Sequence, residues 1–290
     1  MGGWTTADIP DQTGRTHIVT GATSGLGAAT ARALAEAGAE VIMACRNEIK
    51  AQAVAKTIDG KVHIRALDLA DLASIRRFAG TVEGADVLVN NAGVMAVPKS
   101  HTADGFEMQI GTNFLGHFAL TALLLDRLSD RVVNLSSLTH YIGRIDLDDL
   151  NWERRAYSRF GAYAQSKLAA LQFTNELQRR LLAAGSRKLA VAAHPGYAAT
   201  GINSKAGNLL ESIINLGNRF VAQSSEMGAL PTLYAATAAV EPGGYYGPEH
   251  FDWRGAPARN RSSAAAHDEK TMRLLWKQAE ELTGVEFPVG

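Results

Sequence analysis

The chain has 290 residues, of which 46% are hydrophobic and 20% are charged, so it can bury the core of one large α/β domain or of two smaller ones. Its 29 basic residues balance its 29 acidic residues, which excludes a global positive field that would attract nucleic acid or anionic membranes. Cys45 is the only cysteine, residues 1–12 lack the features of a signal peptide, and no apolar run approaches the ~18 residues of a spanning helix. We therefore expect a soluble cytoplasmic protein with no membrane span and no nucleic-acid partner.

Short β-rich runs alternate with helical patterns along the first half of the chain. Strands are predicted at residues 16–20, 40–44, 62–67 and 86–89. Helices are predicted at 25–37, at 48–58, and from the capping residue Asp71 through 78. The strand runs are apolar on both faces, which is typical of a parallel sheet covered by helices on each side. The alternation predicts right-handed crossovers and a doubly wound sheet.

The second half continues the same pattern. Helices are predicted at 106–128, 161–182, 225–239 (broken or kinked at Pro231) and 266–282, and strands at 131–135, 189–193 and within 243–247. No internal repeat or low-complexity linker interrupts the pattern. We expect a single Rossmann-type α/β domain over residues 1–290, with about seven parallel strands and with a C-terminal helix and tail at 266–290.

A glycine-rich turn joins the first strand to the first helix. It reads Thr20-Gly21-Ala22-Thr23-Ser24-Gly25-Leu26-Gly27. Glycines there permit a tight turn and let the backbone approach a pyrophosphate, whose charge meets amide groups at the helix N-terminus. The spacing G-x-x-x-G-x-G differs from the G-x-G-x-x-G fingerprint. We expect Gly21, Thr23, Ser24, Gly25, Leu26 and Gly27 to bind a dinucleotide.

The end of the second strand indicates which dinucleotide. An acidic residue there accepts the ribose 2′-hydroxyl of NAD, whereas an arginine pairs with the 2′-phosphate of NADP. The chain has Ala44-Cys45-Arg46-Asn47 at this place, without an acid. Arg46 therefore favours NADP(H), with NAD(H) as the other possibility, unless it is an ordinary exposed arginine at a strand end.

Tyr163 and Lys167 are the candidate catalytic pair. They stand four residues apart on a predicted helix and therefore share one face. A tyrosine hydroxyl titrates near ~10 in water, and a nearby cation favours the phenolate, so we expect a lowered tyrosine pKa suited to acid–base catalysis. Tyr157 is the rival tyrosine, but Gly161 stands four residues after it.

The chain resembles the short-chain dehydrogenase/reductase family in short motifs that follow the family's order. The matching positions are Thr20-Gly21 with Gly25 and Gly27, Asp68-Leu69, Asn90-Asn91-Ala92-Gly93, Asn113, Ser136-Ser137, Tyr163 with Lys167, and Pro195-Gly196 with Thr200. Seven motifs in order within a βαβ frame make a specific signal.

The resemblance implies a role for each matching residue. Asp68 and Leu69 would contact the adenine, and Asn90, Asn91, Ala92 and Gly93 would support the adenosine side. Tyr163 would be the acid–base, Lys167 would bind the nicotinamide ribose, Ser137 would bond the reacting oxygen, and Asn113 would hold a water of the proton relay. Pro195, Gly196 and Thr200 would border the nicotinamide.

Three stretches are similar to the retinol-dehydrogenase-like and protochlorophyllide-reductase-like branch: Ala44-Cys45-Arg46, 113–118 and 163–168. Ser137 and Tyr163 lie 26 residues apart, and the additional segment 141–160 also resembles that branch. The family places a substrate lid at 201–225, where apolar residues fit a cover over an apolar substrate or, equally, a lid or subunit contact. The family also commonly pairs its two long helices, which predicts a homo-oligomer (dimer or tetramer).

The sequence thus predicts an NADP(H)-dependent oxidoreductase that transfers hydride between a nicotinamide and a small-molecule carbonyl or alcohol. One alternative is a catalytically silent, dinucleotide-binding regulatory protein, although cofactor sensing does not need Asn113, Ser137, Tyr163 and Lys167 together. A sugar-nucleotide epimerase can share the Tyr-Lys spacing, but it usually has G-x-x-G-x-x-G and a longer substrate domain. No metal site is predicted, because the histidines show neither an i,i+4 pair nor an HExxH arrangement.

Overall fold

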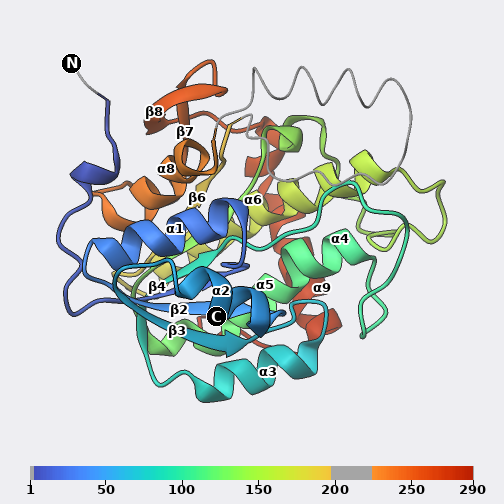
Figure 1. Ribbon diagram of the computed structural model, residues 1–290. Helices are drawn as coiled ribbons and strands as arrows, with labels where there is room; N and C mark the ends of the chain where they lie inside the picture. Colours follow the sequence, from blue (N-terminus) through green and yellow to red (C-terminus); the bar gives the residue numbers. More distant parts are fainter. Residues whose placement is uncertain (1–2, 197–223, 290) are drawn as a thin grey trace, which may run out of the picture.

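A single eight-stranded sheet runs through the computed structural model, which describes residues 3–196 and 224–289 (Figure 1). Its order is β3-β2-β1-β4-β5-β6-β7-β8. The strands are β1 Thr16–Thr20, β2 Glu40–Cys45, β3 Lys61–Ala66, β4 Ala85–Asn90, β5 Leu128–Leu135, β6 Leu189–Ala193, β7 Tyr245–His250 and β8 Arg254–Arg259. Strands β1 to β7 pair in parallel, whereas β8 is antiparallel to β7. The doubly wound α/β fold is confirmed, with one strand more than expected.

The additional strand is β8, at the edge of the sheet. Its sequence, Arg-Gly-Ala-Pro-Ala-Arg, has neither β-branched nor aromatic residues, so propensity does not reveal it. Pro257 is tolerated because an edge strand need not use every amide. Pairing with β7, rather than its own sequence, makes this segment a strand.

Two layers of helices cover the sheet. The helices are α1 Gly25–Glu36, α2 Glu48–Ala55, α3 Leu72–Thr81, α4 Met108–Ile110, α5 Gly116–Leu124, α6 Arg159–Ala183, α8 Ser225–Thr237 and α9 Glu269–Thr283. One apolar core joins the sheet to α1, α2 and α8, and a second joins its other face to α3, α5, α6 and α9. In Figure 1, α1 and α3 lie on opposite sides of β2 and β3. Helix α8 continues through Pro231, so the expected break is not seen.

The helix predicted at 106–128 consists of several pieces. After α4, residues Gly111–Leu115 form a π-helical segment in which the Gly116 amide donates to the Gly111 carbonyl. Helix α5 follows, and a short 3-10 turn at Leu125–Arg127 leads into β5, which begins three residues earlier than expected. Such π-helical insertions are often found at functional sites, and this one contains Asn113.

Residues 108–127 are, among the described residues, the one stretch long and apolar enough to cross a membrane by length and composition. The sequence reading had expected no such run. Within the fold, 89% of its apolar window is buried. The apolar character of this stretch is therefore used in packing α5 against its neighbours.

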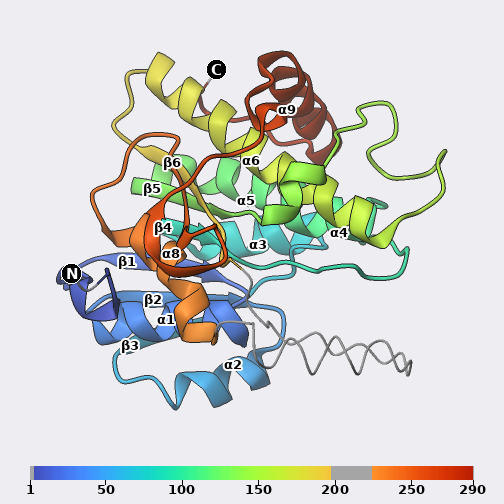
Figure 2. The same ribbon diagram turned by 90° about the horizontal axis from the view of Figure 1, so that it is seen from above.

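The C-terminal helix α9 packs against α5 and α6 (Figure 2). Trp276 and Phe287 insert into an aromatic cluster with Phe118 and Phe173, with ring centroids 5.1 Å apart for Phe118–Trp276 and 4.8 Å apart for Phe118–Phe287. Edge-on aromatic pairs at these distances stabilise beyond their burial alone. Helix α9 thus covers part of α5 and α6. These lie in the two long predicted helices through which the family resemblance predicts a subunit contact.

Candidate active site

The candidate site lies at the carboxyl ends of β1, β4 and β5. The chain moves outward from β1 to β3 in one direction and from β4 to β7 in the other, so the order of connections reverses between β1 and β4. Ligands of open α/β sheets bind at such a reversal. The glycine-rich turn follows β1, and the segment 90–93 follows β4.

The glycine-rich turn has the close packing that excludes side chains. Gly21 and Gly25 have φ values of +68° and +52°, which favour glycine. A Cβ on Gly27 would lie 2.4 Å from the Gly21 carbonyl oxygen and 2.5 Å from Asn91 Nδ2. Ser24 is the N-cap of α1, so Thr23 to Gly27 surround the first turn of that helix. The turn therefore presents backbone amides at a helix N-terminus, as a phosphate requires.

Hydrogen bonds of Thr20 connect the glycine-rich turn to the segment after β4. Its Oγ1 accepts hydrogen bonds from the amides of Asn91 and Ala92, both at 2.9 Å. Asn91 Nδ2 donates to the Thr20 carbonyl at 2.7 Å. Asn91 and Ala92 are thus held beside the glycine-rich turn.

Asn90 lies deeper than the rest of its motif. It is buried, and its Nδ2 donates to Asn134 Oδ1 at 2.8 Å and to Thr121 Oγ1 at 2.9 Å. Gly93 lies on the other side, where an added Cβ would come within 3.1 Å of Asn113 Oδ1 and 3.6 Å of Lys167 Nζ. The segment 90–93 therefore joins the interior of the sheet to the candidate catalytic residues.

The residues expected at the adenosine end of the cofactor follow β2 and β3. Arg46 directly follows β2 and is exposed, and it has no hydrogen bond or ion pair with the described residues. Two residues before it, the Ala44 carbonyl accepts the Gly21 amide at 2.8 Å, which places this strand end beside the glycine-rich turn. Asp68 is half-buried and accepts from the Ala70 amide at 2.9 Å, and Leu69 is buried.

Tyr163 and Ser137 meet across the site. Tyr163 stands in the second turn of α6, whose N-cap is Ser158, and Ser137 follows the end of β5. Ser137 lies close enough to lower the Tyr163 pKa, although the two residues stand far apart in the sequence. Burial has the larger effect and raises the pKa of Tyr163 to about 12. In this structure the Tyr163 pKa is raised, contrary to the lowering that its lysine neighbour suggested.

The position of the Lys167 ammonium explains why this lysine does not lower the Tyr163 pKa. Its Nζ donates to the Leu135 carbonyl oxygen at 2.9 Å and lies 5.7 Å from the centre of the Tyr163 ring. Burial lowers the pKa of Lys167 to about 8. The ammonium is thus tied to the end of β5, beside the tyrosine ring rather than at its hydroxyl.

Asn113 uses its side chain to hold the segment after β4. Its Oδ1 accepts from the Val94 amide at 2.8 Å, and its Nδ2 donates to the Val94 carbonyl and to Ser166 Oγ, each at 2.9 Å. The amide group therefore fixes the loop and α6 relative to the π-helical segment. The water that the family resemblance assigns to Asn113 would meet its backbone carbonyl.

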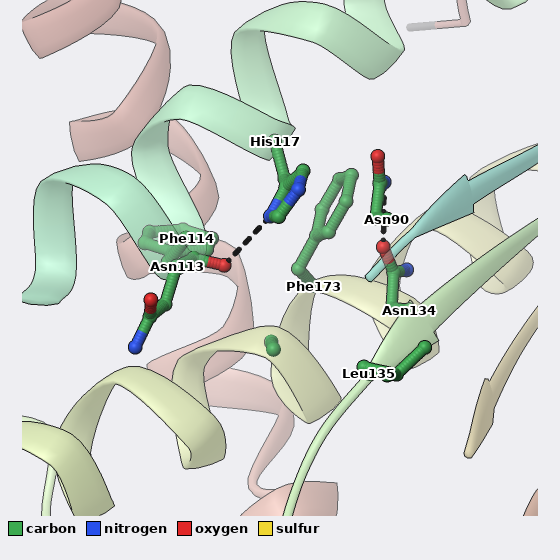
Figure 3. Close-up of a pocket in the computed structure, with 8 residues that line it drawn as sticks. Asn90, Asn113, Phe114, His117, Asn134, Leu135 and Phe173 are labelled. Carbon is green, nitrogen blue, oxygen red and sulfur yellow. Dashed lines mark hydrogen bonds between the residues drawn. The ribbon is translucent and has the colours of Figure 1, made fainter. Parts of the chain in front are cut away.

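That carbonyl faces His117. Figure 3 shows the ring of His117 beside Asn113, with Asn90, Asn134 and Phe173 around a small internal pocket. His117 Nδ1 lies 3.1 Å from the Asn113 carbonyl oxygen, and Nε2 lies 3.0 Å from Thr20 Oγ1. The sequence reading gave His117 no role. Its spacing of four residues from Asn113 on a helix was the available signal.

Two further features escaped the sequence reading. The Leu135 carbonyl that holds Lys167 is a backbone atom, and no residue type marks it. Tyr245 on β7 is buried next to Ser136, and a charge on its phenolate would repel a charge on the phenolate of Tyr163. Burial raises the pKa of Tyr245, so it is a neutral neighbour of the site.

The remaining predicted residues lie at the edge of the described structure. Gly196 has φ +68°, and an added Cβ would lie 2.7 Å from Pro248 Cγ, so Pro195-Gly196 pass against the β7–β8 hairpin. Thr200 and residues 201–223 of the expected lid lie outside the described residues. Within the described ranges, no group of three or more histidine, cysteine or acidic side chains could hold a metal ion.

Comparisons with known proteins agree with this geometry. Residues 15–209 match the short chain dehydrogenase family. Human retinol dehydrogenase 13 is 45% identical, covering 97% of this chain and 87% of that protein, and mouse polyprenol dehydrogenase is 41% identical, covering 95% and 86%. The crystal structure of an uncharacterised protein from Mycobacterium paratuberculosis is 52% identical, covers 99% of both chains and superposes with a TM-score of 0.88. The chain therefore belongs to the short-chain dehydrogenase family, in its retinol-dehydrogenase-like branch, and is an NAD(P)-dependent oxidoreductase.

Proposed function

We propose that the chain is an NADP(H)-dependent oxidoreductase that interconverts an apolar carbonyl compound and its alcohol, with Tyr163 as the acid–base. The observation that carries this proposal is that Ser137 lies close enough to Tyr163 to lower its pKa, with the Lys167 ammonium 5.7 Å from the centre of the Tyr163 ring. Two hydroxyls that meet at the end of a sheet can both contact one substrate oxygen.

The chain's own residues account for binding and proton transfer. The glycine-rich turn, where Gly21 and Gly27 leave no room for a Cβ, fits the pyrophosphate of a dinucleotide. The nicotinamide, when bound, supplies or accepts the hydride. During reduction, Ser137 donates a hydrogen bond to the carbonyl oxygen, and Tyr163 transfers its proton to that oxygen. A Tyr163 pKa of about 12 keeps this proton in place at neutral pH until the oxygen gains charge.

Lys167 assists from beside the ring. Its cation stabilises the phenolate that remains after proton transfer, and it would bind a ribose hydroxyl of the nicotinamide half when the cofactor is bound. Asn113 keeps the π-helical segment and the segment after β4 together, and its carbonyl is the atom that would hold a relay water.

The preference for NADP(H) rests on Arg46. It is exposed beside the glycine-rich turn, has no partner among the described residues, and has no acidic neighbour at the strand end that would bind a ribose 2′-hydroxyl. A guanidinium there suits a 2′-phosphate.

The names of two similar proteins and the exposed apolar side chains of this chain support an apolar substrate. Two similar proteins bear the names retinol dehydrogenase and polyprenol dehydrogenase. Three large apolar side chains that are close in sequence to candidate site residues are exposed: Met95 follows the segment 90–93, Ile142 comes five residues after Ser137, and Phe160 precedes Tyr163 by three residues. A cytoplasmic location and a homo-oligomer stay predictions. A subunit contact would use surface other than that which α9 occupies.

The test is a substrate and cofactor panel with the purified protein. NADPH oxidation is followed with long apolar aldehydes and ketones, with small sugars and hydroxy acids, and with NADH in place of NADPH. We expect turnover with the long apolar carbonyls and a lower KM for NADPH than for NADH. Preference for small polar substrates would refute the apolar assignment. Tight NADPH binding without turnover on any substrate would instead support the silent regulatory protein.

A further inference from the structure

We infer that His117 is a positioning residue that couples the glycine-rich turn to the π-helical segment that carries Asn113, by holding the Thr20 hydroxyl with one ring nitrogen and the Asn113 carbonyl with the other. This inference rests on the proposed function and adds a residue to it. Its geometric basis is a chain of hydrogen bonds that runs from the segment after β4 to the π-helical segment.

The direction of each hydrogen bond in this chain is fixed by its partners. The Asn113 carbonyl can only accept, so His117 Nδ1 carries the proton that spans their 3.1 Å separation. A neutral ring then has an acceptor at Nε2, and Thr20 Oγ1 at 3.0 Å must donate to it. Thr20 can do so because its two acceptor positions already receive the amides of Asn91 and Ala92. A hydroxyl with one donor and two acceptors is thereby fully used.

The neutral state of the ring follows from its surroundings. His117 and Thr20 are buried, with 3% and 0% of their surfaces exposed, so a charge on the ring would lack water. Burial lowers the pKa of His117 to about 4, and the nearby positive charge of Lys167 acts in the same direction. A second proton on the ring would also remove the nearer acceptor of the Thr20 hydroxyl and leave it the Val89 carbonyl oxygen at 3.4 Å. One tautomer, with Nδ1 protonated, satisfies every group.

The two hydrogen bonds of His117 belong to different parts of the site. Thr20 holds the segment after β4 against the glycine-rich turn, so losing the Nε2 acceptor of its hydroxyl loosens the nucleotide side. The Asn113 carbonyl belongs to the π-helical segment, and the Asn113 side chain forms hydrogen bonds with Val94 and Ser166. Losing the Nδ1 donor therefore loosens the catalytic side. Figure 3 shows His117 and Asn113 on the same helical stretch, next to the pocket that Asn90 and Phe173 also line.

Three substitutions separate the two bonds. His117→Asn keeps an amide donor near the Nδ1 position and loses the acceptor for Thr20. His117→Gln places an amide oxygen near the Nε2 position and loses the donor for Asn113. His117→Leu removes both and keeps an apolar side chain. The measurements are Kd for NADPH by its fluorescence, kcat at saturating NADPH, and the thermal midpoint.

We expect His117→Asn and His117→Gln to change different quantities, Kd for NADPH in the first and kcat in the second. Removing one hydrogen bond of about 1.4 kcal/mol changes an equilibrium or rate about tenfold. His117→Asn should raise Kd about tenfold and leave kcat within about twofold, and His117→Gln should do the reverse. In a Thr20→Val background, His117→Asn should have no further effect on Kd, because the donor is gone. Parallel losses in all three variants that follow their thermal midpoints would overturn the inference.

A measurement on the unmodified protein covers the case in which the variants do not fold. Imidazole 15N spectra, with the histidine signals assigned by sequence position, should show His117 neutral and protonated at Nδ1 from pH 5 to 8. The assignment separates it from His140, whose Nδ1 also faces a carbonyl oxygen, that of Ser137 at 2.7 Å. An Nε2-protonated or charged His117 at pH 7 would refute the hydrogen-bond chain. Failure of the unmodified protein to bind NADPH or NADH would refute the proposed function instead, whatever the tautomer.

Discussion

Lys167 Nζ donates a hydrogen bond to the carbonyl oxygen of Leu135, 2.9 Å away, and so connects the candidate catalytic helix to the end of the central strand. The ammonium is buried, and its pKa is lowered to about 8 because burial penalises the charged form. Between this value and the ordinary lysine pKa near 10.5, the unfolded chain binds more protons than the folded one. Stability therefore rises with pH across this window.

We expect this rise to disappear when Lys167 is replaced by methionine. The difference in unfolding free energy between the unmodified protein and Lys167→Met should shift by about 3 kcal/mol in favour of the unmodified protein from pH 8 to 10.5. Urea unfolding at several pH values measures it. Lys61, at the exposed start of β3, gives a matched control with methionine. A constant difference across the window would mean that Lys167 is not buried with a lowered pKa.

Tyr163→Phe should abolish most turnover while NADPH still binds. The substitution removes only the hydroxyl that donates the proton, and loss of a positioned acid–base typically costs about 10²–10⁴ in rate. Tyr157→Phe is the control, because that hydroxyl contacts Glu107 at 2.8 Å and Gln109 at 3.0 Å away from the catalytic pair. Turnover of Tyr163→Phe near that of the control would exclude the proposed mechanism.

Gly27→Ala should prevent dinucleotide binding or folding of the turn. The new methyl group would lie 2.4 Å from a carbonyl oxygen, so the turn must shift. Gly80→Ala on α3 is the matched control, since no atom lies within 4 Å of its new methyl group. The control should gain up to about 1 kcal/mol in stability through helix propensity. NADPH titration and thermal melts compare the two, and equal affinities would contradict the packing.

Arg46→Ala should weaken NADPH binding and spare NADH. A charge-assisted hydrogen bond contributes about 1.5–3 kcal/mol, which corresponds to roughly 10- to 100-fold in KM for NADPH. Arg77→Ala, on the surface of α3, should change neither cofactor. Steady-state kinetics with both cofactors decide the matter, and an equal loss for NADPH and NADH would leave Arg46 without a role in selecting between them.

Acid should destabilise the fold below about pH 6.5. Burial lowers the pKa of His17 to about 4, of His117 to about 4 and of His194 to about 3, so these rings bind protons when the chain unfolds. Because the unfolded state binds more protons between about pH 4 and 6.5, stability is lost as pH falls through that range. Urea unfolding at pH 7.5, 6 and 5 measures the loss. Substituting the exposed His101 should leave the slope unchanged, and a flat profile would contradict the burial of the three rings.

The sequence predicted the parallel sheet and placed Tyr163 and Lys167 one helical turn apart on a helix, because both depend on local patterns, whereas the role of Ser137 beside Tyr163 was implied only by the family resemblance. Glycines, alternating elements and one helical turn of spacing were sufficient. It missed β8, since pairing with β7 creates that strand. It could not give the Tyr163 pKa, because a four-residue spacing does not show that Leu135 holds the lysine or that the ring is buried. His117 was passed over for a similar reason: Thr20 is close to it only in three dimensions.

The aromatic cluster under α9 has a consequence during synthesis. Phe118 and Phe173 contact Trp276 and Phe287, which leave the ribosome long after the sheet strands β1 to β6. Until then the nascent chain carries α5 and α6 with this apolar flank open to water. Such surfaces attract chaperones or other nascent chains. This apolar flank of α5 and α6 is therefore covered only once α9 has been synthesised and docks.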